Sequence, residues 1–139
     1  MPRLTRLYVK TALVYFVAAF LTGAVVAWRA WLPASIPWAV LTPLYYHLLM
    51  VGWVLHLIIG VAVWMFPRWS REQPRGPNWM GYGAYGALNV GLLLRVVAEP
   101  AFVASGASVW AGGLVVSALT QWLGGILVVA LLWPRVRER

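Results

Sequence analysis

The sequence predicts an all-α integral membrane protein, a bundle of four transmembrane helices in up-down-up-down order. Of the 139 residues, 63% are hydrophobic and only 10% are charged, whereas soluble domains carry about 25% charged residues. Four apolar stretches are each long enough for the roughly 20 helical residues that cross a bilayer. No stretch shows the period-2 alternation of a membrane β-barrel. The length fits a single domain over residues 1–139.

The four helices are expected at about residues 7–29, 41–66, 79–99 and 108–133. Pro43 lies in the first turn of the second helix, where a missing N–H is tolerated. Proline disfavours helix in the residue before it, so the third helix is expected to end before Pro100 and the fourth before Pro134. The first stretch also fits a signal peptide, although its apolar run is long for one. Short connections favour antiparallel neighbours.

Basic residues set the expected orientation. If all four helices cross, nine of the eleven lysines and arginines fall on one side: Arg3, Arg6, Lys10, Arg68, Arg71, Arg75, Arg135, Arg137 and Arg139. The positive-inside rule then places both termini in the cytoplasm. The net charge of +8 is read as attraction to anionic membrane lipids, and nucleic-acid binding is not expected. Most of the ten tryptophans fall near helix ends, as in the aromatic belts of membrane proteins.

Several classes of site are excluded by composition. The chain has no cysteine, which excludes disulfides, thiolate metal sites and covalent heme attachment. It has no aspartate, no phosphate-binding loop and no carboxylate pair suited to a cleft, so an enzyme acting alone is not expected. A transporter or channel would show intramembrane acids, a broken helix or repeats. We find no such feature, because Glu99 is expected at a helix end and no span is expected to be interrupted.

Both histidines, His47 and His56, lie in the second expected helix. Ionisable residues in the hydrocarbon are costly and are functional candidates. In an α-helix, residues nine apart fall on opposite faces and differ in depth by about 13 Å, so these two cannot bind one metal together. His56 shares a face with Gly52 and Gly60, and a hydrogen bond to a neighbouring helix explains it adequately.

His47 lies about one turn from the outer helix end, and an apolar face continues below it. That face comprises Met50, Val51, Val54, Ile58, Val61 and Met65. An imidazole above such a wall suits axial ligation of heme iron; the alternative is a histidine that reaches the head groups. Arg29 and Arg95, the only cations outside the basic clusters, lie at similar depth and suit heme propionates. Snorkelling explains either arginine alone, and Arg95 can also pair with Glu99.

Two segments resemble a known family. "HLLMVGWVLHLIIGVAVWMFPR" (His47–Arg68) resembles the second transmembrane helix of heme-copper oxidase subunit I and its nitric oxide reductase relatives. "NVGLLLRVVAEP" (Asn89–Pro100) is similar to the third helix of small four-helix relatives of that superfamily. The resemblance covers roughly a third of the chain and implies that His47 ligates a low-spin heme b. The family's copper-ligand histidines and His-x-His pair are absent, so neither a copper site nor oxygen or nitric oxide reduction is expected.

The family has twelve helices in three arcs of four, so three copies of a four-helix unit would reproduce its ring. A homo-oligomer is therefore expected, with a trimer as the hypothesis. The second axial ligand is left open between Met50, His56 and a partner histidine; Met50, three residues from His47, cannot reach the opposite heme face within one chain. The candidate heme-binding residues are thus His47, which would be the metal ligand, with Arg29, Arg95, Met50, Val54 and His56.

The expected function is a heme-b-binding protein of the inner (cytoplasmic) membrane of a prokaryote. Its role would be electron transfer with a redox partner, gas sensing or heme handling, and the sequence does not choose between them. The alternative is a cofactor-free structural or accessory membrane subunit, in which both histidines only join helices.

Overall fold

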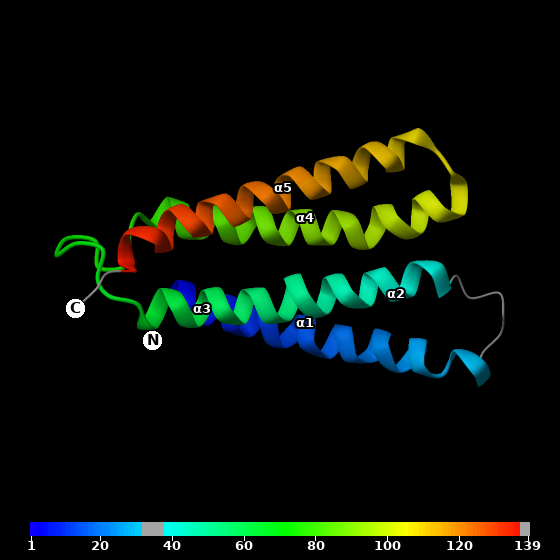
Figure 1. Cartoon of the computed structure of the whole chain (residues 1–139), viewed down its shortest axis with the longest axis horizontal. Coiled ribbons are helices and arrows are strands. Elements are labelled where there is room, and N and C mark those ends of the chain that lie inside the picture. The colour runs from blue at the N-terminus through cyan, green and yellow to red at the C-terminus, as the bar shows by residue number, and fades with distance from the viewer. Residues whose placement is uncertain (32–37, 137–139) are drawn as a thin grey trace.

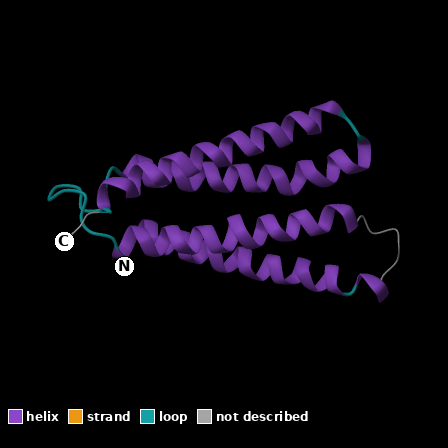
Figure 2. Cartoon of the chain, in the orientation of Figure 1, coloured by secondary structure: helices purple, strands orange, loops and turns teal. Residues whose placement is uncertain are grey.

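Four long helical rods lie side by side in the computed structural model, which describes residues 1–31 and 38–136 (Figure 1). Helix accounts for nearly all of the described chain, and the longest described connection is the loop between the second and third rods, residues 66–77 (Figure 2). The elements are α1 (Arg3–Ala27), η1 (Arg29–Trp31), α2 (Trp38–His47), η2 (Leu48–Leu55), α3 (His56–Met65), α4 (Asn78–Ser105), α5 (Ser108–Leu132) and η3 (Trp133–Arg135). The segments α2, η2 and α3 follow one another without a break and form the second rod.

The rods pair as two hairpins, one of α1 with the second rod and one of α4 with α5. Successive rods run in opposite directions, and the start of α1 lies at the same end as the end of α5 (Figure 1). Four helical stretches are long and apolar enough to cross a membrane: Arg3–Ala27, Val40–Met65, Asn78–Ser105 and Ser108–Arg135. These spans indicate a multi-pass membrane protein, as the composition predicts.

The third helix is longer than expected, because it does not stop at Pro100. α4 continues to Ser105, with Pro100 inside it. Proline has no N–H, so the carbonyl of Val96 loses its usual helical donor, yet membrane helices tolerate this where neighbouring groups compensate. The helix ends where Gly106 adopts a left-handed φ of 62° and its N–H bonds to the Phe102 carbonyl at 2.8 Å. The prediction of an end before Pro100 is therefore wrong.

The second rod is also irregular, although no interrupted span was expected. The segment η2 is a π-helix, whose hydrogen bonds join residues five apart. In a regular α-helix, positions four apart drift around the axis by about 40° per step. The wider π turn offsets that drift, and Leu44, Leu48, Gly52 and His56 all stay buried. Gly52 allows close approach there, since a Cβ at this position would lie 2.7 Å from Cγ of Tyr15 on α1.

The buried side chains form two clusters along the bundle. The cluster toward the end where α1 starts comprises Tyr8, Ile59, Val63, Leu88 and Leu131. The other comprises Tyr15, Ala19, Leu44, Leu48 and Leu92. Outside these clusters many large apolar side chains are exposed, as a surface in contact with lipid requires. Between the two clusters lies the buried imidazole of His56.

Candidate functional site

His56 lies at the centre of the bundle and is fully buried. Its Nδ1 is 2.8 Å from the carbonyl oxygen of Val51, and its Nε2 is 2.9 Å from Nδ2 of Asn89 on α4. A carbonyl only accepts and an amide nitrogen only donates, so Nδ1 carries the proton and Nε2 accepts. The expected hydrogen bond between His56 and a neighbouring helix is confirmed. Both ring nitrogens are occupied, so His56 has no lone pair for a metal in this arrangement.

Asn89 is at the centre of this network, because both polar atoms of its side-chain amide are hydrogen-bonded. Its Oδ1 accepts a hydrogen bond from the Tyr15 hydroxyl at 2.9 Å. Besides bonding to His56, its Nδ2 donates to the Tyr85 carbonyl oxygen at 2.8 Å. The Tyr85 hydroxyl lies 2.7 Å from the Thr11 hydroxyl. Side chains from α1, α3 and α4 are thereby joined at one level, a pattern that favours one alignment of the helices.

Three tyrosine rings enclose His56. The centroids of the Tyr8, Tyr15 and Tyr85 rings lie 5.5, 5.7 and 6.1 Å from the imidazole centroid. Tyr8 also donates its hydroxyl to the Gly81 carbonyl oxygen at 3.1 Å, a second link between α1 and α4. Sequence reasoning missed these tyrosines. The spacing of Tyr8, Ala12, Tyr15 and Ala19, all buried, follows one helix face and was the signal available.

His47 has a different environment. It is the last residue of α2, half-buried, and its Nδ1 lies 2.8 Å from the carbonyl oxygen of Pro43. Because that carbonyl only accepts, Nδ1 carries a proton, and in the neutral imidazole the lone pair is then on Nε2. No described residue hydrogen-bonds to Nε2. A backbone bond at one nitrogen and a free lone pair at the other is the usual state of a metal-binding histidine.

The relation between the two histidines also differs from the expected one. The expected angle of about 180° around the helix axis between His47 and His56 assumes that the residues between them form a regular α-helix. In the structure, all eight of these residues belong to the π-helix η2. A π segment takes more residues for each turn, so the true offset is smaller and that part of the prediction is wrong. Both ring nitrogens of His56 are hydrogen-bonded, so in this arrangement His56 offers no lone pair to a metal beside His47.

The apolar face expected to carry a porphyrin is largely open to the membrane. Met50, Ile58 and Met65 are 55%, 58% and 68% exposed, and Val54 is half-buried. No other helix among the described residues covers the face completely. A flat ligand on this face would therefore have its second side against lipid or another subunit.

Arg29 and Arg95 have no described contact with His47. Arg29, in η1, is exposed. Arg95 pairs instead with Glu99, as the spacing allowed, with 3.6 Å between Nε and Oε2. Glu99 lies inside α4 rather than at its end, so an acidic residue is present within a span. Among the described contacts, no hydrogen bond or ion pair joins His47 to Arg29 or Arg95, and the described residues form no cluster of three or more His, Cys, Asp or Glu.

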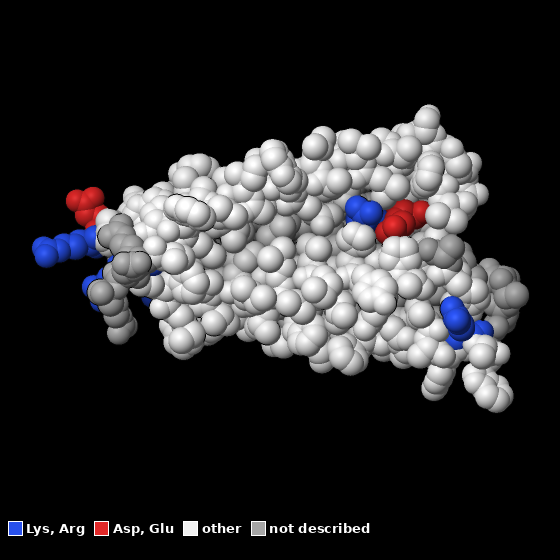
Figure 3. Space-filling model, in the orientation of Figure 1, with Lys and Arg blue, Asp and Glu red and all other residues white. Residues whose placement is uncertain are grey.

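Charge is concentrated toward the molecule's ends (Figure 3). Between the ends, the face shown in Figure 3 carries one basic side chain (blue) that adjoins one acidic side chain (red). One basic residue is hidden, however: Arg135 is 1% exposed. It donates to the carbonyl oxygens of Val63, Phe66 and Pro67 at 3.0, 2.8 and 2.8 Å. In the sequence, Arg135 is only one of the basic residues that indicate the orientation in the membrane. In the structure it caps the C-terminal end of α3, where cations are favoured.

The comparisons with known proteins add no relative. The chain matches no protein-family model, no curated protein and no solved structure.

Proposed function

We propose that this protein binds heme b through His47, as a small four-helix relative of the heme-copper oxidase subunit I superfamily. Its role would be electron transfer, gas sensing or heme handling. One observation carries the proposal: His47 is held by a backbone carbonyl at Nδ1 and has Nε2 free. Axial ligation of heme iron needs such a nitrogen and an apolar surface for the ring, and exposed Met50 and Ile58 belong to such a surface.

The orientation proposed for the protein places both termini in the cytoplasm of a prokaryotic cell, in its inner membrane. Support comes from Arg3, Arg6, Arg68, Arg71 and Arg75, which precede or open the first helix or follow the second, because basic residues near helix ends favour the cytoplasmic side. His47 would then lie in the half of the membrane away from the cytoplasm. Arg29 would lie near the membrane surface on that same, non-cytoplasmic side.

The open face below His47 supports an assembly of several copies. A heme lying there needs cover on its second side and a second axial ligand if the iron is six-coordinate. His56 cannot supply that ligand while it is bonded to Asn89. A histidine from another copy would supply it, and closed homo-oligomers are common. We propose a trimer, which would bring twelve helices together. Arg95 is paired with Glu99, so it would bind a heme propionate only if it bridged the two carboxylates or if its ion pair with Glu99 broke.

The test is the absorbance of protein purified from heme-replete cells. We expect a Soret band in the wild type, its loss in His47→Ala, and its retention in Met50→Leu, which keeps the apolar face. His56→Ala should retain heme in whatever fraction still folds, measured as heme per folded chain. Equal heme in His47→Ala and the wild type would refute the site.

A cofactor-free structural or accessory subunit is the second candidate. The observation in its favour is the complete hydrogen bonding of His56 and Asn89, which gives one of the two histidines a purely structural role. This candidate predicts no Soret band in the wild type even after incubation with hemin, together with unchanged assembly of His47→Ala.

A further inference from the structure

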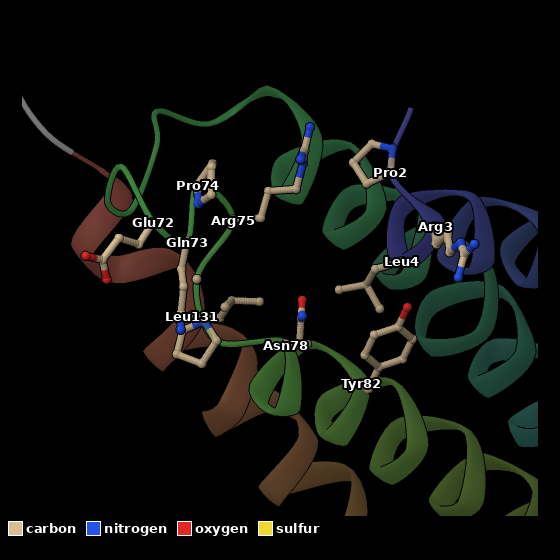
Figure 4. Close-up of a pocket in the computed structure, with 13 residues that line it drawn as sticks. Pro2, Arg3, Leu4, Glu72, Gln73, Pro74, Arg75, Asn78, Tyr82 and Leu131 are labelled. Atoms are coloured by element: carbon tan, nitrogen blue, oxygen red, sulfur yellow. The ribbon is translucent and has the colours of Figure 1, made fainter.

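A polar hollow of about 450 Å³ opens at the basic end of the bundle (Figure 4). Four parts of the chain line it: the start of α1, the loop between α3 and α4, the first turns of α4 and the end of α5. Its cationic residues are Arg3 and Arg75, and Asn78 and Tyr82 add polar groups. Leu4 and Leu131 also line it, so the hollow combines positive charge with an apolar part.

Figure 4 shows how these side chains are arranged. The amide of Asn78 and the side chain of Leu4 are directed into the hollow, and Arg75 rises beside it. Glu72, the acidic residue of the lining, has its carboxylate directed away. Among the described residues, the side chains of Arg3 and Arg75 have no hydrogen-bond or ion-pair partner. Within the part of the chain that the structure describes, the positive charge of the hollow is therefore not paired with a negative group.

The loop that carries Arg75 is held in place by its own hydrogen bonds. The Trp69 N–H donates to the Pro74 carbonyl oxygen at 3.0 Å, and the Gly76 N–H donates to the Gln73 carbonyl oxygen at 3.0 Å. Gly76 is buried with a left-handed φ of 81°, which favours glycine. Arg135 fixes the start of the same loop through the carbonyl of Pro67. The hollow is thus preformed, which reduces the entropy lost when a ligand binds.

Two helix starts add to the positive potential. α1 and α4 both begin at this hollow, and neither has an acidic residue in its first turn or a side-chain cap. Helix N-termini carry partial positive charge and favour anions, phosphate above all. At the end of four membrane-spanning helices, the phosphate groups nearest to hand are those of the lipids.

From this arrangement we infer that the hollow is a binding site for the phosphate group of an anionic phospholipid. Arg3, whose side chain extends away from the hollow in Figure 4, would turn inward and pair with the phosphate together with Arg75. Asn78 would donate a hydrogen bond, and Leu4 and Leu131 would contact the apolar part of the lipid. The inference is independent of heme binding and needs only that the chain spans a membrane.

Native mass spectrometry of the detergent-purified full chain tests the site. Retention of phosphatidylglycerol is compared with that of phosphatidylcholine, in the wild type and in two double variants. Arg3→Gln/Arg75→Gln removes both cations of the hollow. Arg68→Gln/Arg71→Gln removes the same charge from the α3–α4 connection, at positions that do not line the hollow.

We expect the wild type to prefer phosphatidylglycerol. Each arginine lost from the hollow should weaken retention about tenfold, because a hydrogen bond between charged groups is lost. The control pair should change retention less than twofold. Equal losses in the two double variants, or no preference between the two lipids, would show only diffuse attraction and overturn the site. Displacement of the lipid by millimolar inorganic phosphate would show that a free phosphate is the ligand and overturn the assignment to lipid. Circular dichroism checks that all variants are folded.

Discussion

The two histidines of the second rod differ in how much of their chemistry the fold uses. His56 is fully buried, and both of its ring nitrogens have partners within the chain. His47, nine residues earlier, has one nitrogen bonded to its own helix and the other free. A buried polar group without a partner destabilises the fold, which explains why the network around His56 is complete. The lesson is that a histidine within a span is a binding candidate only to the extent that a ring nitrogen remains unused.

The strongest challenge to this comparison is Asn89→Leu. The substitution removes three hydrogen bonds and leaves His56 Nε2 and the Tyr15 hydroxyl buried without partners. We expect a loss of about 2–3 kcal/mol in the free energy of unfolding. Unfolding by denaturing detergent in mixed micelles, followed by circular dichroism, measures it. Thr120→Val is the matched control, since Thr120 is bonded only to its own helix; equal losses would show that the network is not special.

Gly52→Ala tests whether close packing holds the network in place. A Cβ at Gly52 would lie 2.7 Å from Cγ and 2.8 Å from Cβ of Tyr15, atoms that cannot move without shifting α1. Overpacking of this kind costs about 1–3 kcal/mol, and thermal unfolding in detergent should show it. A Cβ at Gly112 would meet nothing within 4 Å, so Gly112→Ala should be neutral or slightly stabilising. A neutral Gly52→Ala would contradict the tight α1–η2 contact.

Tyr15→Phe isolates a single bond of the network. It removes the hydroxyl that donates to Asn89 Oδ1 at 2.9 Å and keeps the ring beside His56. We expect about 1 kcal/mol of destabilisation in the same unfolding experiment. The same change at Tyr46, which is 56% exposed, should have no measurable effect. Similar values for the two variants would mean that the Tyr15 hydroxyl contributes nothing.

His47→Ala should have the smallest effect on stability. It removes one hydrogen bond within a helix, worth about 0.5 kcal/mol, from a half-buried position. The prediction is for protein without heme, so the unfolding measurement uses chain purified from heme-depleted cells. A loss as large as that of Asn89→Leu would show that His47 is a core residue and would end the contrast with His56.

The sequence was sufficient to predict the four spans, because long apolar runs depend on local composition alone. It was not sufficient to predict where α4 ends. The preference against helix before a proline is local, and it says nothing of the tertiary packing that lets a membrane helix continue past Pro100 to Ser105. The π segment was missed for a similar reason. Within it, Gly52 packs closely against Tyr15 of another helix, a contact that the local sequence does not reveal.

The candidate site was predicted only in part. Its histidines were found because polar residues stand out in apolar helices, and the pairing of Arg95 with Glu99 followed from their spacing. The network of Asn89 with Tyr15 was not found, because it depends on how α1 and α4 are aligned against each other. Arg135 was assigned to the basic surface cluster. Its burial depends on the end of α5 meeting the end of α3, which composition does not encode.

The position of Arg135 has a consequence for how the protein assembles. The second rod precedes α4 and α5 in the chain, but the side chain that bonds to the carbonyl groups at its end, Arg135, comes from just beyond α5. Until that last segment docks, three carbonyl groups at the membrane border must be hydrated. These carbonyl groups therefore gain their Arg135 partner only when the end of α5 lies beside the end of α3.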